Sequence, residues 1–166
     1  MKVKWGLMYK KILIPTDGSE ISNAAARAGV EFAQQLGAEV IGLFVSPEYQ
    51  YPVFIEIIPP NFPSEDEYLA SMRKVGEHHL QVIADAAQAA GVKSSGITIF
   101  SDAAAREIVN TATQHGCDLI YIGSHGRSGW GGALLGSTTT KVLSTCQIPV
   151  LVYRMAKQPG STADKK

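Results

Sequence analysis

Short apolar runs recur along the chain and predict five β-strands. Their residues are apolar at nearly every position, which suits central strands of a parallel sheet with helices packed on both faces. The five runs are Ile12–Pro15, Val40–Val45, Ile97–Phe100, Leu119–Ile122 and Val150–Tyr153.

Between these runs, apolar residues recur every three or four positions, and this spacing predicts α-helices. The predicted helices are Ser19–Leu36, Ser64–Ala90, Ala103–His115 and Ser137–Thr145. A glycine follows each of the first three, and glycine is a common helix stop because it adopts the left-handed conformation easily.

The pattern also predicts helix starts and buried faces. Ser64 is expected to cap the second helix, with acidic residues 65–67 in its first turn, and Asp102 is expected to cap the third. The first helix is expected to bury Ala25, Ala28, Phe32 and Leu36. The second is expected to bury Leu69, Met72, Leu80 and Ile83.

Strands and helices alternate along the chain, and this order predicts the fold class. Alternation with right-handed crossovers gives an α/β, three-layer, doubly wound open parallel sheet with helices on both faces. Ligands of such sheets bind beyond the carboxyl ends of the strands. The site is therefore expected just after Ile14, Phe44, Phe100 and Ile122.

Composition and charge exclude several classes of protein. The 166 residues are 45% hydrophobic and 18% charged, with 15 basic and 15 acidic side chains, which is typical of a soluble globular domain and excludes a disordered chain. A net charge of zero gives no support to nucleic acid as a partner, so any phosphate must be held by local geometry. No apolar run is long enough to span a bilayer and no signal peptide is seen, so we expect a cytoplasmic protein with no membrane partner. Cys117 and Cys146 lack metal or redox spacing and are expected to be small buried residues.

The chain is expected to contain one domain. Residues 1–8 are interpreted as an N-terminal extension or a vector-derived scar, residues 9–155 as a single α/β domain, and residues 156–166 as a flexible polar tail. Tyr49–Pro63 holds four of the eight prolines, so it cannot be a central strand. Either a mobile flap, an interface loop or a plain surface excursion accounts for it.

The segment after the fourth strand is rich in glycine and carries the candidate chemistry. Six glycines lie within Gly123–Gly136, and glycines let backbone N–H groups approach an anion without a Cβ in the way. The next helix begins at Ser137, so its amides and the hydroxyls of residues 137–139 are expected to face the same anion. The Walker lysine is missing and the dinucleotide fingerprint G-x-G-x-x-G fails, so neither a P-loop nor a nicotinamide dehydrogenase fits. A surface loop that merely tolerates glycine is the alternative.

These residues resemble the ATP-binding branch of the universal stress protein family. Its pattern G-x-x-G-x9-G-[S/T] is met by Gly123, Gly126, Gly136 and Ser137. The opening Lys11–Ser19, which contains Pro-Thr-Asp-Gly-Ser, and the closing Ile148–Val152 are also similar to the family. The resemblance covers residues 9–153.

The resemblance implies a strand order of 3-2-1-4-5 and a site for ATP, with Mg²⁺ or Mn²⁺ carried by the phosphates. Pro15 and Thr16 would shape the floor, and Asp17 would accept hydrogen bonds from the ribose hydroxyls or cap the first helix. Backbone groups at Val45 would read the adenine edge, and Ile122 would pack on the base. Gly123 would face the ribose. The phosphates would face Gly126, Arg127, Ser128, Gly136, Ser137 and Thr138.

Three functions are compatible with the sequence. The favoured one is a nucleotide-dependent regulatory or stress-response module with at most slow hydrolysis and no assigned catalytic residue. An ATPase or phosphotransferase would need a base, for which only Asp17 and His125 are candidates; His125 suits a backbone-fixing or dimer-contact role better. A nucleotide-free partner-binding scaffold is the third. His78 and His79 are adjacent on one helix, so they point apart and cannot ligate one metal together.

Self-association is also expected. The last strand, Val150–Tyr153, should lie at a sheet edge, where its unpaired backbone groups invite a twofold partner. The family resemblance favours the same homodimer.

Overall fold

A computed structural model describes residues 9–52, 59, 61–125 and 135–155. Every predicted strand and helix is present in it. The elements are β1 (Lys11–Thr16), α1 (Glu20–Leu36), β2 (Glu39–Ser46), α2 (Glu65–Ala90), β3 (Ser94–Phe100), α3 (Ala104–Gln114), β4 (Leu119–Gly123), α4 (Ser137–Thr145) and β5 (Val150–Tyr153). The predicted extension at 1–8 and tail at 156–166 lie outside the described residues.

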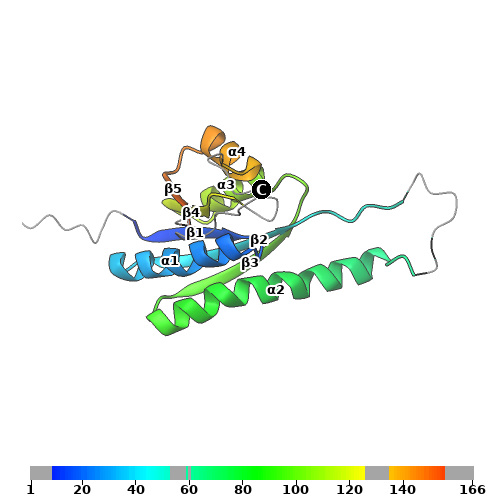
Figure 1. Cartoon of the computed structure of the whole chain (residues 1–166), viewed down its shortest axis with the longest axis horizontal. Helices are drawn as coiled ribbons and strands as arrows, with labels where there is room; N and C mark the ends of the chain where they lie inside the picture. Colours follow the sequence, from blue (N-terminus) through cyan, green and yellow to red (C-terminus); the bar gives the residue numbers. More distant parts are fainter. Residues whose placement is uncertain (1–8, 53–58, 60, 126–134, 156–166) are drawn as a thin grey trace, which may run out of the picture.

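The five strands form one parallel sheet in the order β3-β2-β1-β4-β5. Helices α1 and α2 cover one face of this sheet, and α3 and α4 cover the other (Figure 1). The chain therefore has the predicted doubly wound α/β fold. The strand order reverses between β1 and β4, and such a reversal is where these folds bind ligands.

The ends of α1 and α2 follow local rules. The hydroxyl of Ser19 accepts a hydrogen bond from the amide of Ser22 at 3.3 Å. Ser64 and Glu67 form a reciprocal capping box at the start of α2, which satisfies two otherwise unpaired amides. Gly37 and Gly91 end the two helices in the left-handed conformation, each with φ of 67°.

The predicted cap of α3 is wrong. Ala103 occupies the cap position and supplies no side-chain hydrogen bond. The carboxylate of Asp102 instead accepts the amide of Glu48 at 3.0 Å and the side-chain amide of Gln50 at 3.0 Å. Asp102 therefore holds the chain leaving β2 against the β3–α3 corner.

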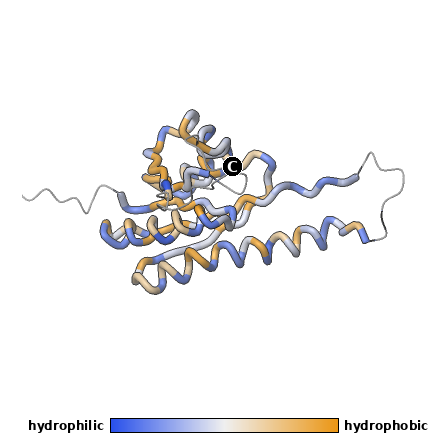
Figure 2. The backbone as a smooth tube through the Cα atoms, in the orientation of Figure 1, coloured by the Kyte–Doolittle hydropathy of each residue, from blue (hydrophilic) through white to orange (hydrophobic). Residues whose placement is uncertain are grey.

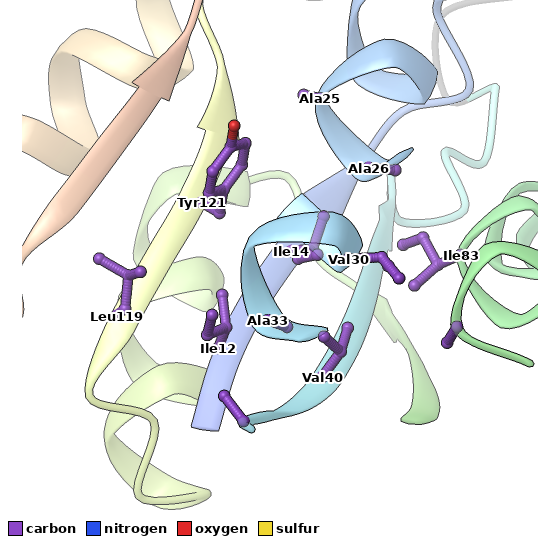
Figure 3. Close-up of a cluster of buried hydrophobic side chains, with 12 residues drawn as sticks. Ile12, Ile14, Ala25, Ala26, Val30, Ala33, Val40, Ile83, Leu119 and Tyr121 are labelled. Carbon is purple, nitrogen blue, oxygen red and sulfur yellow. The ribbon is translucent and has the colours of Figure 1, made fainter. Parts of the chain in front are cut away.

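A core cluster between the sheet and helices α1 and α2 is built from small residues on α1 and branched residues on the strands. Figure 3 shows Ile12 and Ile14 of β1 beneath the buried face of α1. Of the predicted face, Ala25 is buried, and Ala28, Phe32 and Leu36 are half-buried and pack against this cluster. The buried residues of α1 are Ser22, Ala25, Ala26, Gly29, Val30 and Ala33.

Helix α2 extends well beyond the sheet at its amino-terminal end (Figure 1). Hydrophilic and hydrophobic stretches alternate along it (Figure 2). Of its four residues predicted to be buried, only Ile83 is, whereas Leu69, Met72 and Leu80 are half-buried. Leu69 and Met72 belong to the amino-terminal half, where α2 leaves the sheet.

Strands β1 and β4 are tied together at their amino-terminal ends but not at their carboxyl ends. Asp118 accepts the amides of Lys10 and Lys11 at 2.8 and 3.1 Å, which ties β4 to the start of β1. Pairing between the two strands ends at Leu13 and Ile120, although both strands continue beyond these residues. Their carboxyl ends therefore leave room for a cavity between them.

The two cysteines were expected to be small buried residues. Cys117 is buried, and burial raises the pKa of its thiol to about 11, whereas Cys146 is only half-buried. Within the described ranges, no helix is both long and apolar enough to cross a membrane.

Candidate functional site

A cavity of about 300 Å³ opens at the carboxyl ends of β1, β2 and β4, where the strand order reverses. The first turns of α1, α3 and α4 complete its wall. Its lining residues are Pro15, Thr16, Asp17, Ser22, Leu43, Val45, Ala104, Ile108, Ile122, Gly123, His125, Gly136, Ser137, Thr138 and Thr139.

Every predicted site residue that the structure describes lies in this lining. These residues are Pro15, Thr16, Asp17, Val45, Ile122, Gly123, Gly136, Ser137 and Thr138. The other predicted phosphate-facing residues, Gly126, Arg127 and Ser128, lie outside the described residues. Segments more than a hundred residues apart in the sequence thus meet around one cavity.

The cavity has an apolar part that the sequence analysis found only in part. Val45 and Ile122 were predicted, and Leu43 and Ile108 join them in the lining. Leu43 lies two residues before Val45 on β2, so strand alternation puts both on one face and could have revealed it. Ala104 and Ile108 lie one helical turn apart on α3, and only the packing of α3 on the sheet brings them here.

The turn between β1 and α1 forms the polar side of the cavity. The carboxylate of Asp17 accepts the amide of Ser19 at 3.0 Å, so Asp17 shapes the turn while Ser19 is the helix cap. The buried hydroxyl groups of Thr16 and Ser22 lie 3.2 Å apart, and Thr16 also accepts the amide of Gly18 at 3.2 Å. These bonds fix the backbone that presents Asp17.

Two hydrogen bonds join the end of β4 to the start of α4. The amide of Gly136 donates to the carbonyl of Ser124 at 2.8 Å, and the buried hydroxyl of Thr139 donates to the carbonyl of Gly123 at 2.9 Å. The expectation that the Thr139 hydroxyl faces an anion is therefore wrong, because this hydroxyl ties α4 to the end of β4. Ser137 and Thr138 remain in the lining of the cavity.

Helix α4 begins at the cavity with a residue that offers no cap. Gly136 has φ −62° and ψ 154°, and no side chain caps the helix there. Any residue can adopt this extended conformation, so backbone geometry does not require glycine at this position. A glycine at the wall of a cavity keeps that space open, and the helix N-terminus beside it favours negative charge.

The charges around the cavity are few. The described lining contains no lysine or arginine, and its titratable members are Asp17 and His125. The imidazole Nδ1 of His125 lies 3.0 Å from the hydroxyl of Ser124, which fits the predicted backbone-fixing role without testing it. No cluster of three metal-ligating side chains occurs within the part of the chain that the structure describes.

The two adjacent histidines on α2 differ in burial, but their rings lie close together and do not point apart as expected. His78 is exposed and His79 is half-buried, with ring centroids 5.8 Å apart. His79 packs edge-on against Phe44 at 5.3 Å.

Comparison with known families agrees with this geometry. The model of the universal stress protein family matches residues 8–154. The chain belongs to the universal stress protein family. This match contains all strands and helices of the sheet and the whole lining of the cavity.

Individual members of the family cover nearly the whole chain. Universal stress protein MJ0531 of Methanocaldococcus jannaschii is 32% identical over 91% of this chain and 85% of its own length. Universal stress protein YxiE of Bacillus subtilis is 36% identical over 89% of this chain and all of its own length.

Solved structures share the fold. The structure of protein MJ0577 of Methanocaldococcus jannaschii has a TM-score of 0.73 at 29% identity, covering 92% of this chain and 100% of that one. A universal stress protein solved in complex with cAMP has a TM-score of 0.62 at 21% identity, covering 90% and 99%. One from Archaeoglobus fulgidus, in complex with dAMP, has a TM-score of 0.62 at 16% identity, covering 89% and 100%.

Proposed function

We propose that residues 9–155 form a single nucleotide-binding domain that binds ATP and acts as a regulatory module, with at most slow hydrolysis. This places the chain in the ATP-binding branch of its family. The observation that carries the proposal is the cavity at the strand reversal, which gathers every described residue that the family pattern assigns to ATP.

The chemistry of the lining suits the three parts of ATP. The apolar residues Leu43, Val45 and Ile122 suit an adenine ring. Val45 lies one residue beyond the last pair between β2 and β1, where its backbone can read the base edge. The carboxylate of Asp17 suits the ribose hydroxyls, and the start of α4 suits the phosphates. Mg²⁺ or Mn²⁺ would then be held by the phosphates and water.

Two relatives support adenine nucleotides as the ligand class. The universal stress proteins solved with cAMP and dAMP both hold an adenine, and both share the fold of this chain. Net charge supports the same reading, because a chain with 15 basic and 15 acidic residues has to hold an anion by placed amides and not by bulk charge.

Titration calorimetry of the purified, nucleotide-free chain with ATP and with GTP tests the proposal. In the presence of Mg²⁺, ATP is expected to bind with much higher affinity than GTP, because a backbone edge that matches the adenine donor and acceptor pattern does not match guanine. Nucleotide released by acid from the protein as purified provides an independent check. A chain that binds neither nucleotide would instead be the nucleotide-free scaffold.

We further propose that the chain forms a homodimer through β5, which lies at an edge of the sheet. The carbonyls of Pro149 and Tyr153 accept hydrogen bonds from Ile120 and Ser124 on the β4 side, at 3.0 and 2.8 Å. Backbone groups alternate between the two sides of a strand, so those of Val150 and Val152 face the outer edge. This edge can pair with a second copy.

Light scattering tests the dimer. The native chain is expected at twice its 17.8 kDa at tens of micromolar, whereas Val152→Pro, which removes an outward amide, is expected to shift the mass toward the monomer. Val152→Ala is the matched control, because it removes the same apolar side chain but keeps the amide. A monomeric native chain, or an equal effect of both variants, contradicts pairing through β5.

A further inference from the structure

The side chain of His79 on α2 lies against the turn that carries Asp17. Gly18 at the centre of that turn has φ of +76°, and a Cβ atom placed there would overlap the imidazole ring of His79. The ring therefore lies directly against the backbone of Gly18. The same ring packs edge-on against Phe44 of β2, with ring centroids 5.3 Å apart.

Three hydrogen bonds within this turn are local. Thr16 accepts the amide of Gly18 at 3.2 Å, Asp17 accepts the amide of Ser19 at 3.0 Å, and the side-chain amide of Asn23 donates to the carbonyl of Gly18 at 3.5 Å. Local bonds of this kind define the shape of a turn but leave it free to tilt as a unit. A ring wedged between Gly18 and Phe44 limits such a tilt, because it comes from a different element that is itself packed on the sheet.

We propose that His79 is a positioning residue that holds the Gly18 turn so that Asp17 faces the ribose of the nucleotide. This inference rests on the proposed ATP site and adds to it a residue of α2 that is not part of the cavity lining. A shift of α2 along its axis would move the ring off Gly18 and change the affinity for the ribose.

The effect should depend on the ribose hydroxyls, and this dependence supplies a readout that general destabilisation would not give. We expect His79→Ala to weaken ATP binding about tenfold, the scale of losing a hydrogen bond to a charged group. Binding of 2′,3′-dideoxy-ATP should be unchanged by the same substitution, because that ligand offers Asp17 no hydroxyl. Titration calorimetry of both ligands against both proteins measures this difference.

Glu77→Ala is the matched control, since Glu77 is an exposed neighbour on the same helix. It should leave the affinity for both ligands unchanged. His79→Phe keeps a planar ring over Gly18 and should bind ATP more tightly than His79→Ala does. Should His79→Ala fail to fold, His79→Leu replaces it, with the same expected loss because it lacks the planar ring.

Three results would overturn the inference. His79→Ala could bind ATP as tightly as the native chain, it could lose affinity for both ligands equally, or His79→Phe could bind ATP no more tightly than His79→Ala. All three presuppose that the native chain binds ATP. A native chain that binds neither ligand refutes the proposed function itself, and the role of His79 is refuted with it.

Discussion

Replacing Gly136 with aspartate is expected to weaken ATP binding more than a hundredfold and to leave the fold as stable as before, or slightly more stable. Gly136 has the extended conformation of a helix cap, and no side chain caps α4. An aspartate there would accept amides of the first turn of α4, which gains a few tenths of a kcal/mol over glycine. The same carboxylate would occupy the wall of the cavity and repel the phosphates, so ATP affinity should fall by about 3 kcal/mol, more than a hundredfold.

Thermal denaturation and titration calorimetry of Gly136→Asp measure the two opposite effects. Gly136→Ser adds a neutral cap and should reduce affinity less. Ser144→Asp adds the same charge to the exposed last turn of α4, and it should leave ATP affinity unchanged. If Gly136→Asp binds ATP normally, the phosphates do not lie at the start of α4.

The strands and most helix ends could be predicted because they depend on neighbouring residues. Apolar runs report burial on both faces of a strand, and Ser64 with Glu67 forms its capping box within one turn. Asp102 shows the limit of such local rules. Its carboxylate accepts hydrogen bonds from Glu48 and Gln50, which follow the neighbouring strand β2 and lie more than fifty positions earlier in the chain. The local pattern of a cap contains no sign of this contact.

The buried face of α1 was predicted only in part, for a related reason. Hydropathy favours the large residues Phe32 and Leu36, but α1 lies so close to the sheet that its smallest residues occupy the interface. A Cβ atom on Gly29 would lie 2.8 Å from Cδ1 of Ile14 and 3.1 Å from Cδ1 of Tyr121. The distance between a helix and a sheet is set by both surfaces together, so the pattern of one helix does not reveal it.

The candidate site could be predicted where the family pattern names residues, and only in part elsewhere. Strand ends meet at the reversal of strand order, so Asp17, Val45 and Gly123 could be placed together before the structure was known. The cavity wall from α3 could not, because Ala104 and Ile108 reach the cavity only through the packing of α3 on the sheet. His79 is hidden in the sequence for the same reason. Only the fold places it on Gly18.

The charges of the site bear on whether the chain is an enzyme. A dedicated ATPase places a base or water-orienting group in line with the γ-phosphate and compensates the developing charge with cations. The described lining offers backbone amides at the start of α4, with Asp17 and His125 as its titratable groups and no lysine or arginine. Amides that hold the ground state and the transition state alike tighten binding without raising the rate.

We therefore expect ATP to be retained and hydrolysed far more slowly than the roughly 1 to 100 s⁻¹ typical of kinases. A single-turnover assay with labelled ATP and protein freed of contaminating ATPases measures the rate. Asp17→Ala is expected to weaken binding because it removes the acceptor for the ribose hydroxyls, and His125→Ala is expected to leave any residual hydrolysis unchanged. Turnover faster than about 1 s⁻¹ that either substitution abolishes at saturating ATP would assign that side chain to the chemical step. In that event the ATPase reading replaces the regulatory module, because a rate of this size requires a group that acts on the transition state alone.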